Sequence, residues 1–327
     1  MSTLKYLPLT FCYMLAVLCL DACCSCFQAE IPATEAEYVS RTNITLFEQP
    51  IWSPDGKSLA LKEFKYPEAK EHTRLFLYTF DNEQLNSIPN TLGDYRTVSW
   101  SPDSTKLVVA RLDDRGAGID IQVIDLSTAT VATIGRGKGA AWAPNGQSIA
   151  IYVGPRMNRE LSQFVINLVQ PDGTLIKPVT LPITPTPSSD GDTFDSLSWS
   201  PDSQQIVLSI SHWPVNHQAT STLYLINVDT TEFHQLTTED TNLQPVWSPD
   251  GNMIAFIKQN PASLSGKIYL LWPSKNCSTP LSETIVAKSL SWSPDGSRIA
   301  YENATKVYLF DVAKKLASGN LVGKACQ

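Results

Sequence analysis

The residues that could carry acid–base or metal chemistry are few in this chain. Three of its four histidines, His72, His212 and His217, fall between strand-like runs, and the fourth, His234, lies within one. Three histidines can hold a divalent metal if the fold brings them together. An enzyme remains one hypothesis on this basis, and clustering of the three histidines would favour it.

Other catalytic patterns are missing from the sequence. The chain has no Gly-x-Ser-x-Gly nucleophile motif, no His-Glu-x-x-His and no calcium-loop pattern. The acidic pair Asp113–Asp114 lies in a segment between strands, where such pairs are usually solvated. We therefore favour a protein with no catalytic residues, no metal and no cofactor.

A repeated motif specifies the elements that would position any site. Trp-Ser-Pro-Asp-Gly or a close variant occurs six times, at intervals of 42 to 57 residues, beginning at Trp52, Trp100, Trp142, Trp199, Trp247 and Trp292. A period of about 40–50 residues is typical of one four-stranded propeller blade. The six tryptophans are expected to have a structural role, filling the wedges between neighbouring blades.

Each motif copy lies between two short runs of apolar and β-branched residues, which predicts a hairpin. Ser-Pro-Asp suits a type I turn, and Gly readily takes the left-handed position that follows. Ser104 and Ser203 replace that Gly in two copies and should bring a small strain. A third strand follows each hairpin and a fourth follows in most repeats, so the sequence predicts an all-β, six-bladed β-propeller.

These Trp-Ser-Pro-Asp-Gly repeats resemble the WD-like repeats of the TolB propeller family, which also occur in the propellers of prolyl oligopeptidase-type peptidases. The resemblance covers about residues 38–312. It implies a propeller fold, but it is a weak guide to function, and the binding roles of TolB within its envelope complex do not simply carry over. TolB carries an α/β domain before its propeller, and here only a short segment precedes the first repeat, so that domain is expected to be absent.

Two segments compete to close the ring. Residues 38–52 align without a gap with residues 233–247, in which 233–237 form an outer strand, so 38–42 should be an outer strand of the last blade. The rival is 316–322, but Gly319 makes it a poor strand. We predict closure by an N-terminal outer strand.

The N-terminus has the layout of a signal peptide, with Lys5 before an apolar run over 6–20. The run is too short for a comfortable membrane span. Leu-Asp-Ala-Cys at 20–23 resembles a bacterial lipoprotein box with Cys23 as the lipidated residue, although Asp21 is unusual there. The predicted organisation is a signal peptide over 1–22, a tether over 23–36, the propeller over 37–315 and a C-terminal tail over 316–327. The alternatives are a secreted protein and an uncleaved anchor.

Seven cysteines divide unevenly. Five lie between Cys12 and Cys26, and two, Cys277 and Cys326, lie in the body of the chain. Exported proteins meet an oxidising compartment, so Cys277 and Cys326 are predicted to form a disulfide.

Charge and loop composition indicate the kind of partner. The net charge is −7 without a basic run, which argues against nucleic acid. Long segments predicted to share one face are 63–74, 111–118, 154–163, 182–193 and 211–220, and long loops on a rigid scaffold commonly bind partners. They contain Arg111, Arg156, His212 and Trp213.

Four residues before each motif Trp stand Glu48, Arg96, Lys138, Asp195, Leu243 and Lys288. Five of the six are charged. They form either a ligand-selecting ring at the channel mouth or a set of mutual salt bridges. The resulting hypothesis is a monomeric, lipid-anchored envelope protein that binds a protein or glycan through Arg96, Lys138, Asp195, Lys288 and the loop residues. The alternative is a propeller lyase or hydrolase acting on an exported polysaccharide.

Overall fold

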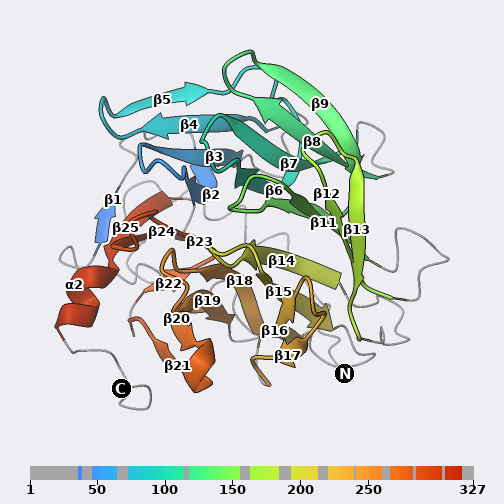
Figure 1. Ribbon diagram of the computed structural model, residues 1–327. Helices are drawn as coiled ribbons and strands as arrows, with labels where there is room; N and C mark the ends of the chain where they lie inside the picture. Colours follow the sequence, from blue (N-terminus) through green and yellow to red (C-terminus); the bar gives the residue numbers. More distant parts are fainter. Residues whose placement is uncertain are drawn as a thin grey trace, which may run out of the picture.

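The computed structural model has an all-β propeller fold (Figure 1). It describes residues 36–38, 46–64, 73–113, 118–154, 163–183, 193–212, 220–238, 241–259, 266–282, 285–303 and 306–318. The sheets stand side by side around a common axis, with their first strands innermost and their last strands at the circumference.

Four of the sheets have four strands each, and every neighbouring pair in them is antiparallel. The first contains β2 (Leu46–Trp52), β3 (Ser58–Phe64), β4 (Leu75–Thr79) and β5 (Gln84–Ser87). The second contains β6 (Tyr95–Trp100), β7 (Lys106–Leu112), β8 (Ile119–Asp125) and β9 (Thr130–Arg136). The third contains β10 (Gly139–Trp142), β11 (Ile149–Val153), β12 (Val165–Val169) and β13 (Leu175–Thr180).

A nine-stranded sheet follows along the chain. Its first part contains β14 (Thr193–Trp199), β15 (Gln205–His212), β16 (Thr220–Asn227) and β17 (Phe233–Gln235). Its second part contains β18 (Thr241–Trp247), β19 (Ile254–Gln259), β20 (Gly266–Trp272), β21 (Cys277–Pro280) and β22 (Val286–Ala287). A short 3₁₀-helix, η2 (Pro273–Lys275), connects β20 to β21. The two parts are joined by a single parallel pair, Ser221 with Thr241.

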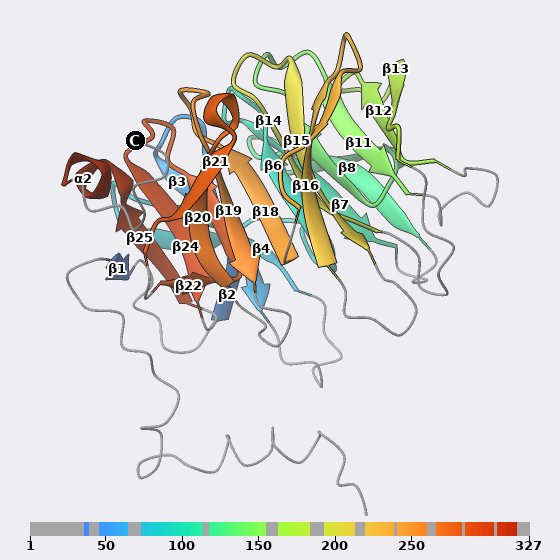
Figure 2. The ribbon, with the colours of Figure 1, turned by 90° about the horizontal axis from the view of Figure 1, so that it is seen from below.

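Chain segments from both ends share the last four-stranded sheet. It contains β23 (Ser289–Trp292), β24 (Arg298–Asn303) and β25 (Lys306–Asp311), and β1 (Ala36–Tyr38) pairs antiparallel with β25. Figures 1 and 2 both show β1 beside β25. The outer strand predicted over 38–42 therefore begins two residues earlier, at Ala36, and 39–42 lie outside the described residues.

The competing C-terminal segment begins in a helix. The chain leaves β25 into α2 (Val312–Ala317), whose N-cap Asp311 accepts a hydrogen bond from the Lys314 amide. Buried Val312 and half-buried Leu316 pack against the last sheet. Residues 316 and 317 are thus helical, and 319–327 lie outside the described residues.

Apolar clusters fill the spaces between successive sheets. Trp100 packs with Leu75 and Ile88 of the preceding sheet, and Trp199 packs with Phe164 and Ile166. The last sheet packs on the first in the same way, with Leu309 in one cluster with Phe47. Five of the six motif tryptophans expose 9% or less of their surface, so the rings lie inside these interfaces.

The motif turns adopt the geometry that their residues favour. In the first copy the Gly56 amide donates to the Ser53 carbonyl, and the Ser53 hydroxyl donates to the Asp55 carboxylate at 2.6 Å. Gly56 has φ +73°, and Ser104 in the next copy has φ +61°. The Ser104 hydroxyl accepts the amide of Asp55 from the adjacent turn at 3.1 Å.

Ser203 repeats this arrangement by accepting the Asn145 amide at 3.0 Å. The left-handed serines that the sequence marked as strained therefore gain an inter-turn hydrogen bond that glycine could not make.

Candidate functional site

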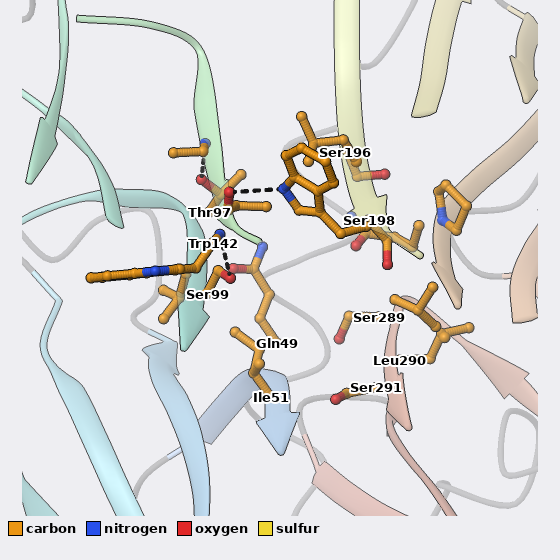
Figure 3. Close-up of a pocket in the computed structure, with 18 of the residues that line it drawn as sticks. Gln49, Ile51, Thr97, Ser99, Trp142, Ser196, Ser198, Ser289, Leu290 and Ser291 are labelled. Carbon is orange, nitrogen blue, oxygen red and sulfur yellow. Dashed lines mark hydrogen bonds between the residues drawn. The ribbon is translucent and has the colours of Figure 1, made fainter. Parts of the chain in front are cut away.

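A cavity of about 260 Å³ lies between the innermost strands (Figure 3). Its walls come from β2, β6, β10, β14, β18 and β23, the six strands that end at a motif tryptophan. Each wall contributes the residues one to three positions before the Trp. The site is therefore built from equivalent positions of the repeat and not from a single loop.

Three alternate strands present hydroxyl groups to the cavity. The residue directly before the Trp is Ser99 on β6, Ser198 on β14 and Ser291 on β23. Each of these serine oxygens accepts a backbone N–H from the next inner strand. The pairs are Trp142 to Ser99 at 3.1 Å, Trp247 to Ser198 at 3.2 Å and Trp52 to Ser291 at 3.1 Å. These three serines hold neighbouring inner strands together around the cavity.

Two positions earlier the same three strands carry a second set of hydroxyls. Thr97 accepts the Ala140 amide at 3.1 Å, and Ser289 donates to Glu302 at 3.1 Å. Ser196 has a buried oxygen without a partner among the described residues. The residue equivalent to Ala140 on β18 is Pro245, which has no N–H to give. Ser196 is thus left unsatisfied by the proline opposite it.

The other set of strands carries amides instead of hydroxyls. Gln49 on β2 and Gln244 on β18 stand three residues before their Trp and line the cavity. Both lie where the strand register shifts, in β-bulges against β3 and β19, and both are left-handed, with φ 54° and 52°. A non-glycine residue in this region costs about 1 kcal/mol or more, and such strain often marks functional positions.

Neither glutamine side chain has a hydrogen-bond partner among the described residues. In Figure 3 the Gln49 side chain extends away from β2 into the space between the strands. The two bulges therefore place two glutamines, whose side chains have no described partner, on the lining of one cavity.

Glu302 on β24 supports this wall from behind. It is 2% exposed, accepts the backbone N–H of Gln49 at 3.3 Å and the hydroxyl of Ser289 at 3.1 Å, and lies 4.0 Å from the Lys288 ammonium. Burial raises the pKa of Glu302 above its usual value, and the nearby carboxylate of Glu48 raises it further. Glu48 itself pairs with Lys62 at 2.5 Å.

The predicted charged ring is only partly assembled. Arg96 is exposed and lines the cavity, and it is the extra residue of a bulge between β6 and β7. Lys288 has 41% of its side chain exposed, and the Lys138 side chain lies over Gly154. Glu48 is paired with Lys62, and the side chain of Asp195 lies outside the described residues. Of the five predicted charges, the two with exposed side chains in the described residues, Arg96 and Lys288, are positive.

The predicted loop residues divide between the described and undescribed parts of the chain. Arg111 lies on β7 beside Tyr95, where burial raises the Tyr95 pKa to about 12 although Arg111 opposes the shift. His212 ends β15, with its ring 3.4 Å from the Tyr224 hydroxyl. Arg156 and Trp213 lie outside the described residues, as do His72 and His217, so clustering of the three histidines is not decided.

The remaining predicted positions concern anchoring and cross-linking. Cys277 is disulfide-bonded. Cys326 and Cys23 lie outside the described residues, so the pairing and the lipidation stay predictions. Within the described ranges no three His, Cys, Asp or Glu side chains are grouped to hold a metal ion. Nor does that part of the chain contain a helix with the length and apolar character needed to cross a membrane.

Two features of the cavity were missed at the level of sequence. One is the alternation between hydroxyl strands (Thr97-Val-Ser, Ser196-Leu-Ser and Ser289-Leu-Ser) and the strands containing Gln49-Pro and Gln244-Pro. This alternation is readable by aligning the six copies at their Trp. The other is Glu302, a charged residue within an apolar strand, which burial alone distinguishes from a solvated one.

Comparison with known proteins supports the fold. No family model matches the chain, and no curated protein matches it in sequence. Among solved structures, a putative TolB from Agrobacterium tumefaciens superposes with a TM-score of 0.61 at 18% identity, covering 84% of this chain and 92% of that one.

TolB from Acinetobacter baumannii gives a TM-score of 0.55 at 16% identity, over 82% of this chain and 63% of that one. An oligogalacturonate lyase in complex with manganese gives 0.53 at 14%, over 85% and 94%. At these identities the similarity shows a shared propeller fold.

Proposed function

We propose that this protein is a non-catalytic binding scaffold built on a six-bladed propeller. The nine-stranded sheet supplies two of the six blades, because one residue pair alone joins its two parts and each part begins with its own motif strand. The pairing of β1 with β25 supports closure of the ring by the N-terminal strand. The six apolar clusters, one between each pair of successive repeats, including the last with the first, support the same count.

The observation that carries the binding role is the character of the cavity and its rim. Arg96 and Tyr152 are the titratable side chains among its described lining residues, and the rest offer hydroxyls, carboxamides and apolar surface. General acid–base catalysis needs a positioned group that exchanges a proton near neutral pH. The cavity has the polar and apolar mixture of a recognition site.

The rim indicates the chemistry of the partner. Arg96, Lys138 and Lys288 occupy equivalent positions at the start of inner strands, and the side chains of Arg96 and Lys288 are exposed. We infer that the partner is an envelope protein or glycan with acidic groups, which docks on the long-loop face with help from Arg111, Arg156, His212 and Trp213. The TolB neighbours are consistent with such a scaffold.

We further propose that the protein is held at the membrane of the cell envelope by a lipid on Cys23. The support is the sequence over 1–23, with its short apolar run before the cysteine. Metabolic labelling with a palmitate analogue tests this directly. Label in the wild type and none in Cys23→Ser is expected, whereas label in both variants would contradict the assignment.

Neutralising the rim tests the binding role. Arg96→Gln, Lys138→Gln and Lys288→Gln together should reduce capture of the partner from envelope extracts at least tenfold, because removing complementary charge slows association and weakens the complex. The matched control changes three cations at the opposite end of the blades, Lys57, Arg298 and Lys314, to Gln. Equal capture by both triple variants would contradict the proposed face.

A propeller enzyme acting on an exported polysaccharide is the second candidate, favoured by the fold similarity to an oligogalacturonate lyase solved with manganese. It predicts turnover of acidic oligosaccharides that depends on added manganese. Assay of the full chain for unsaturated products separates the two, since the binding scaffold should form none.

A further inference from the structure

We propose that the central cavity binds a single neutral sugar ring through the side-chain amides of Gln49 and Gln244. The inference rests on the proposed binding function and specifies a small-molecule ligand for the interior of the same site. Its first support is the pair of bulges themselves. Two inner strands independently place a glutamine in the left-handed region at the same repeat position, and both residues line the same cavity.

The free hydrogen-bonding groups are the second support. The carboxamides of Gln49 and Gln244 have no partner among the described residues, and the Ser196 oxygen is buried without one. A carboxamide offers a donor and an acceptor side by side. That arrangement matches two adjacent hydroxyls of a sugar, one donating to the amide oxygen and the other accepting from the amide nitrogen.

The three cavity serines that directly precede a motif Trp, here called the serine ring, add hydroxyl donors. Ser99, Ser198 and Ser291 each use their oxygen to accept a backbone N–H, so each keeps its own hydroxyl proton to donate. No described acceptor takes these protons. A ligand with several acceptor oxygens would satisfy them, as a polyhydroxylated ring does.

Size and charge restrict the ligand class. The cavity of about 260 Å³ is just below the range of about 300–1,000 Å³ that holds drug-sized molecules. One sugar ring fits this volume better than a peptide segment. Arg96 is the one charged group among the described lining residues, and it stands at the rim, so the interior favours a neutral ligand. Apolar walls from Leu197, Val246 and Leu290 suit the carbon face of the ring.

The test uses glycine substitutions, which remove the amide and relieve the left-handed strain at once. Titration calorimetry on the detergent-solubilised full chain would use D-glucose, D-galactose and N-acetyl-D-glucosamine as probes. At least one should bind the wild type. Gln49→Gly and Gln244→Gly should each weaken that binding about tenfold, the loss expected for a carboxamide making two hydrogen bonds. Both variants should fold, because glycine accepts the same φ.

The matched control is Ala129→Gly, since Ala129 is also left-handed, with φ 56°, but lies in the turn between β8 and β9. It should leave sugar affinity unchanged. D-glucuronate and the neutral tripeptide Ala-Ser-Ala serve as probes of the other classes. Binding of glucuronate alone, lost in Arg96→Gln, would overturn the proposal in favour of a charge-driven site, and binding of the tripeptide alone would overturn it in favour of a peptide channel.

Three further results would also overturn it: no binding by any of the three sugars, sugar binding unaffected by both glutamine variants, or equal loss in Ala129→Gly. Measuring partner capture in parallel distinguishes failure of the sugar-binding inference from failure of the proposed function. Capture that persists while sugars fail to bind removes this inference alone. Sugar binding that persists while the rim variants capture normally removes the proposed docking face alone.

Discussion

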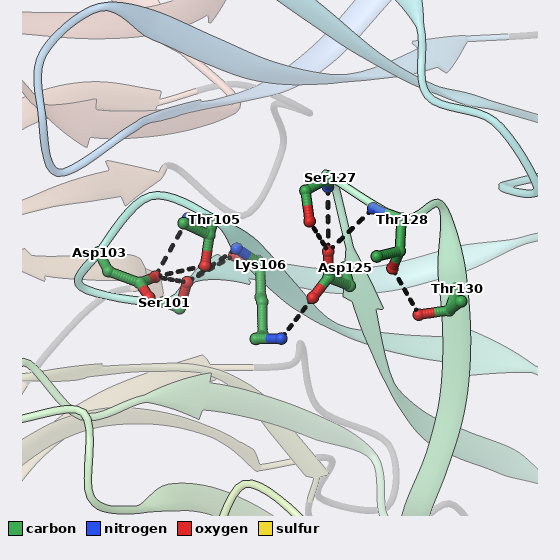
Figure 4. Close-up of polar contacts among 8 residues, drawn as sticks. All are labelled: Ser101, Asp103, Thr105, Lys106, Asp125, Ser127, Thr128 and Thr130. Carbon is green, nitrogen blue, oxygen red and sulfur yellow. Dashed lines mark hydrogen bonds and ion pairs between the residues drawn. The ribbon is translucent and has the colours of Figure 1, made fainter.

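The turns at one end of the inner strands and the cavity between those strands treat their polar side chains differently. In the turns these groups are hydrogen-bonded within the protein, whereas in the cavity several of them have no partner among the described residues. In the second turn, Asp103 accepts from the hydroxyl of Ser101 and from the amide and hydroxyl of Thr105, and nearby Lys106 pairs with Asp125 at 2.5 Å (Figure 4). These bonds, the Ser101 hydroxyl first, lower the pKa of Asp103. In the cavity, two carboxamides and a buried hydroxyl have no partner within the described structure.

This difference separates a region whose polar groups are satisfied by the protein from one that keeps polar groups available for a ligand. Both regions contain left-handed non-glycine residues. At Ser104 the conformation is offset by a hydrogen bond to the next turn, whereas at Gln244 the side chain gains nothing from the protein itself. Stored strain beside unsatisfied polar groups is the expected signature of a binding site.

The largest effect on stability should come from the motif tryptophans, which form a frame common to the turns and the cavity. Trp247→Ala removes a ring with 9% of its surface exposed, packed with Val207 and Leu223 of the preceding strands. We expect a loss of about 3–5 kcal/mol in the free energy of unfolding, measured by denaturant titration. Trp213→Ala, outside the repeat motif, should barely change it. Similar losses in the two variants would contradict the division between frame and loop.

The Trp frame and its turns are also the part that the sequence alone predicts best. The five-residue motif predicts its own turn type, and its spacing of 42–57 residues predicts the repeat. The extension of the propeller to β1 followed from one ungapped alignment, although the strand begins at Ala36. Local chemistry decides these elements, so local sequence reveals them.

The cavity could not be predicted in the same way. Ser196 and Ser198 look equivalent in sequence, yet one is satisfied and the other is not, because the partner residue belongs to a strand 49 positions away in the chain. The significance of Glu302 likewise depends on its burial against β2. Groups whose environment is set by the ring, and not by the repeat, need the assembled structure.

The second prediction concerns Ser198→Ala, which removes a hydroxyl that joins two inner strands. The Ser198 oxygen accepts the backbone N–H of Trp247, which would be left unpaired in a partly buried position. An unsatisfied buried donor costs about 1–3 kcal/mol. We expect a loss in that range, with a melting temperature lower by a few degrees in differential scanning calorimetry. Unchanged stability would show that the serine ring does not tie the inner strands together.

The pH dependence of the stability of Glu302→Gln tests the environment of the buried carboxyl behind the cavity wall. Because burial and Glu48 raise the pKa of Glu302, the folded state binds its proton more tightly than the unfolded state. Stability from this group is therefore fully present below the unfolded pKa of about 4.5 and falls as pH rises through the folded value.

Charged neighbours that face Glu302 are Glu48 and Lys288, with Lys62 beyond Glu48. Glutamine keeps an acceptor for the Gln49 amide without the charge. We expect Glu302→Gln to be more stable than wild type at pH 7, by about 1 kcal/mol, and the difference to vanish near pH 4. A variant that is less stable at pH 7 than at pH 4, relative to wild type, would reverse the assigned sign.

The smallest effect should separate the two serines of β14. Ser196→Ala removes a hydroxyl that is buried without a partner, so no hydrogen bond is lost and the cost of burying the oxygen disappears. We expect the free energy of unfolding to stay within about 0.5 kcal/mol of wild type or to rise slightly, in contrast to the loss at Ser198 two residues along the same strand. Chemical denaturation of both variants under one buffer condition measures the difference directly. A loss of about 1 kcal/mol or more at Ser196 would mean that its hydroxyl has a stabilising partner, and the cavity would then resemble the satisfied turns after all.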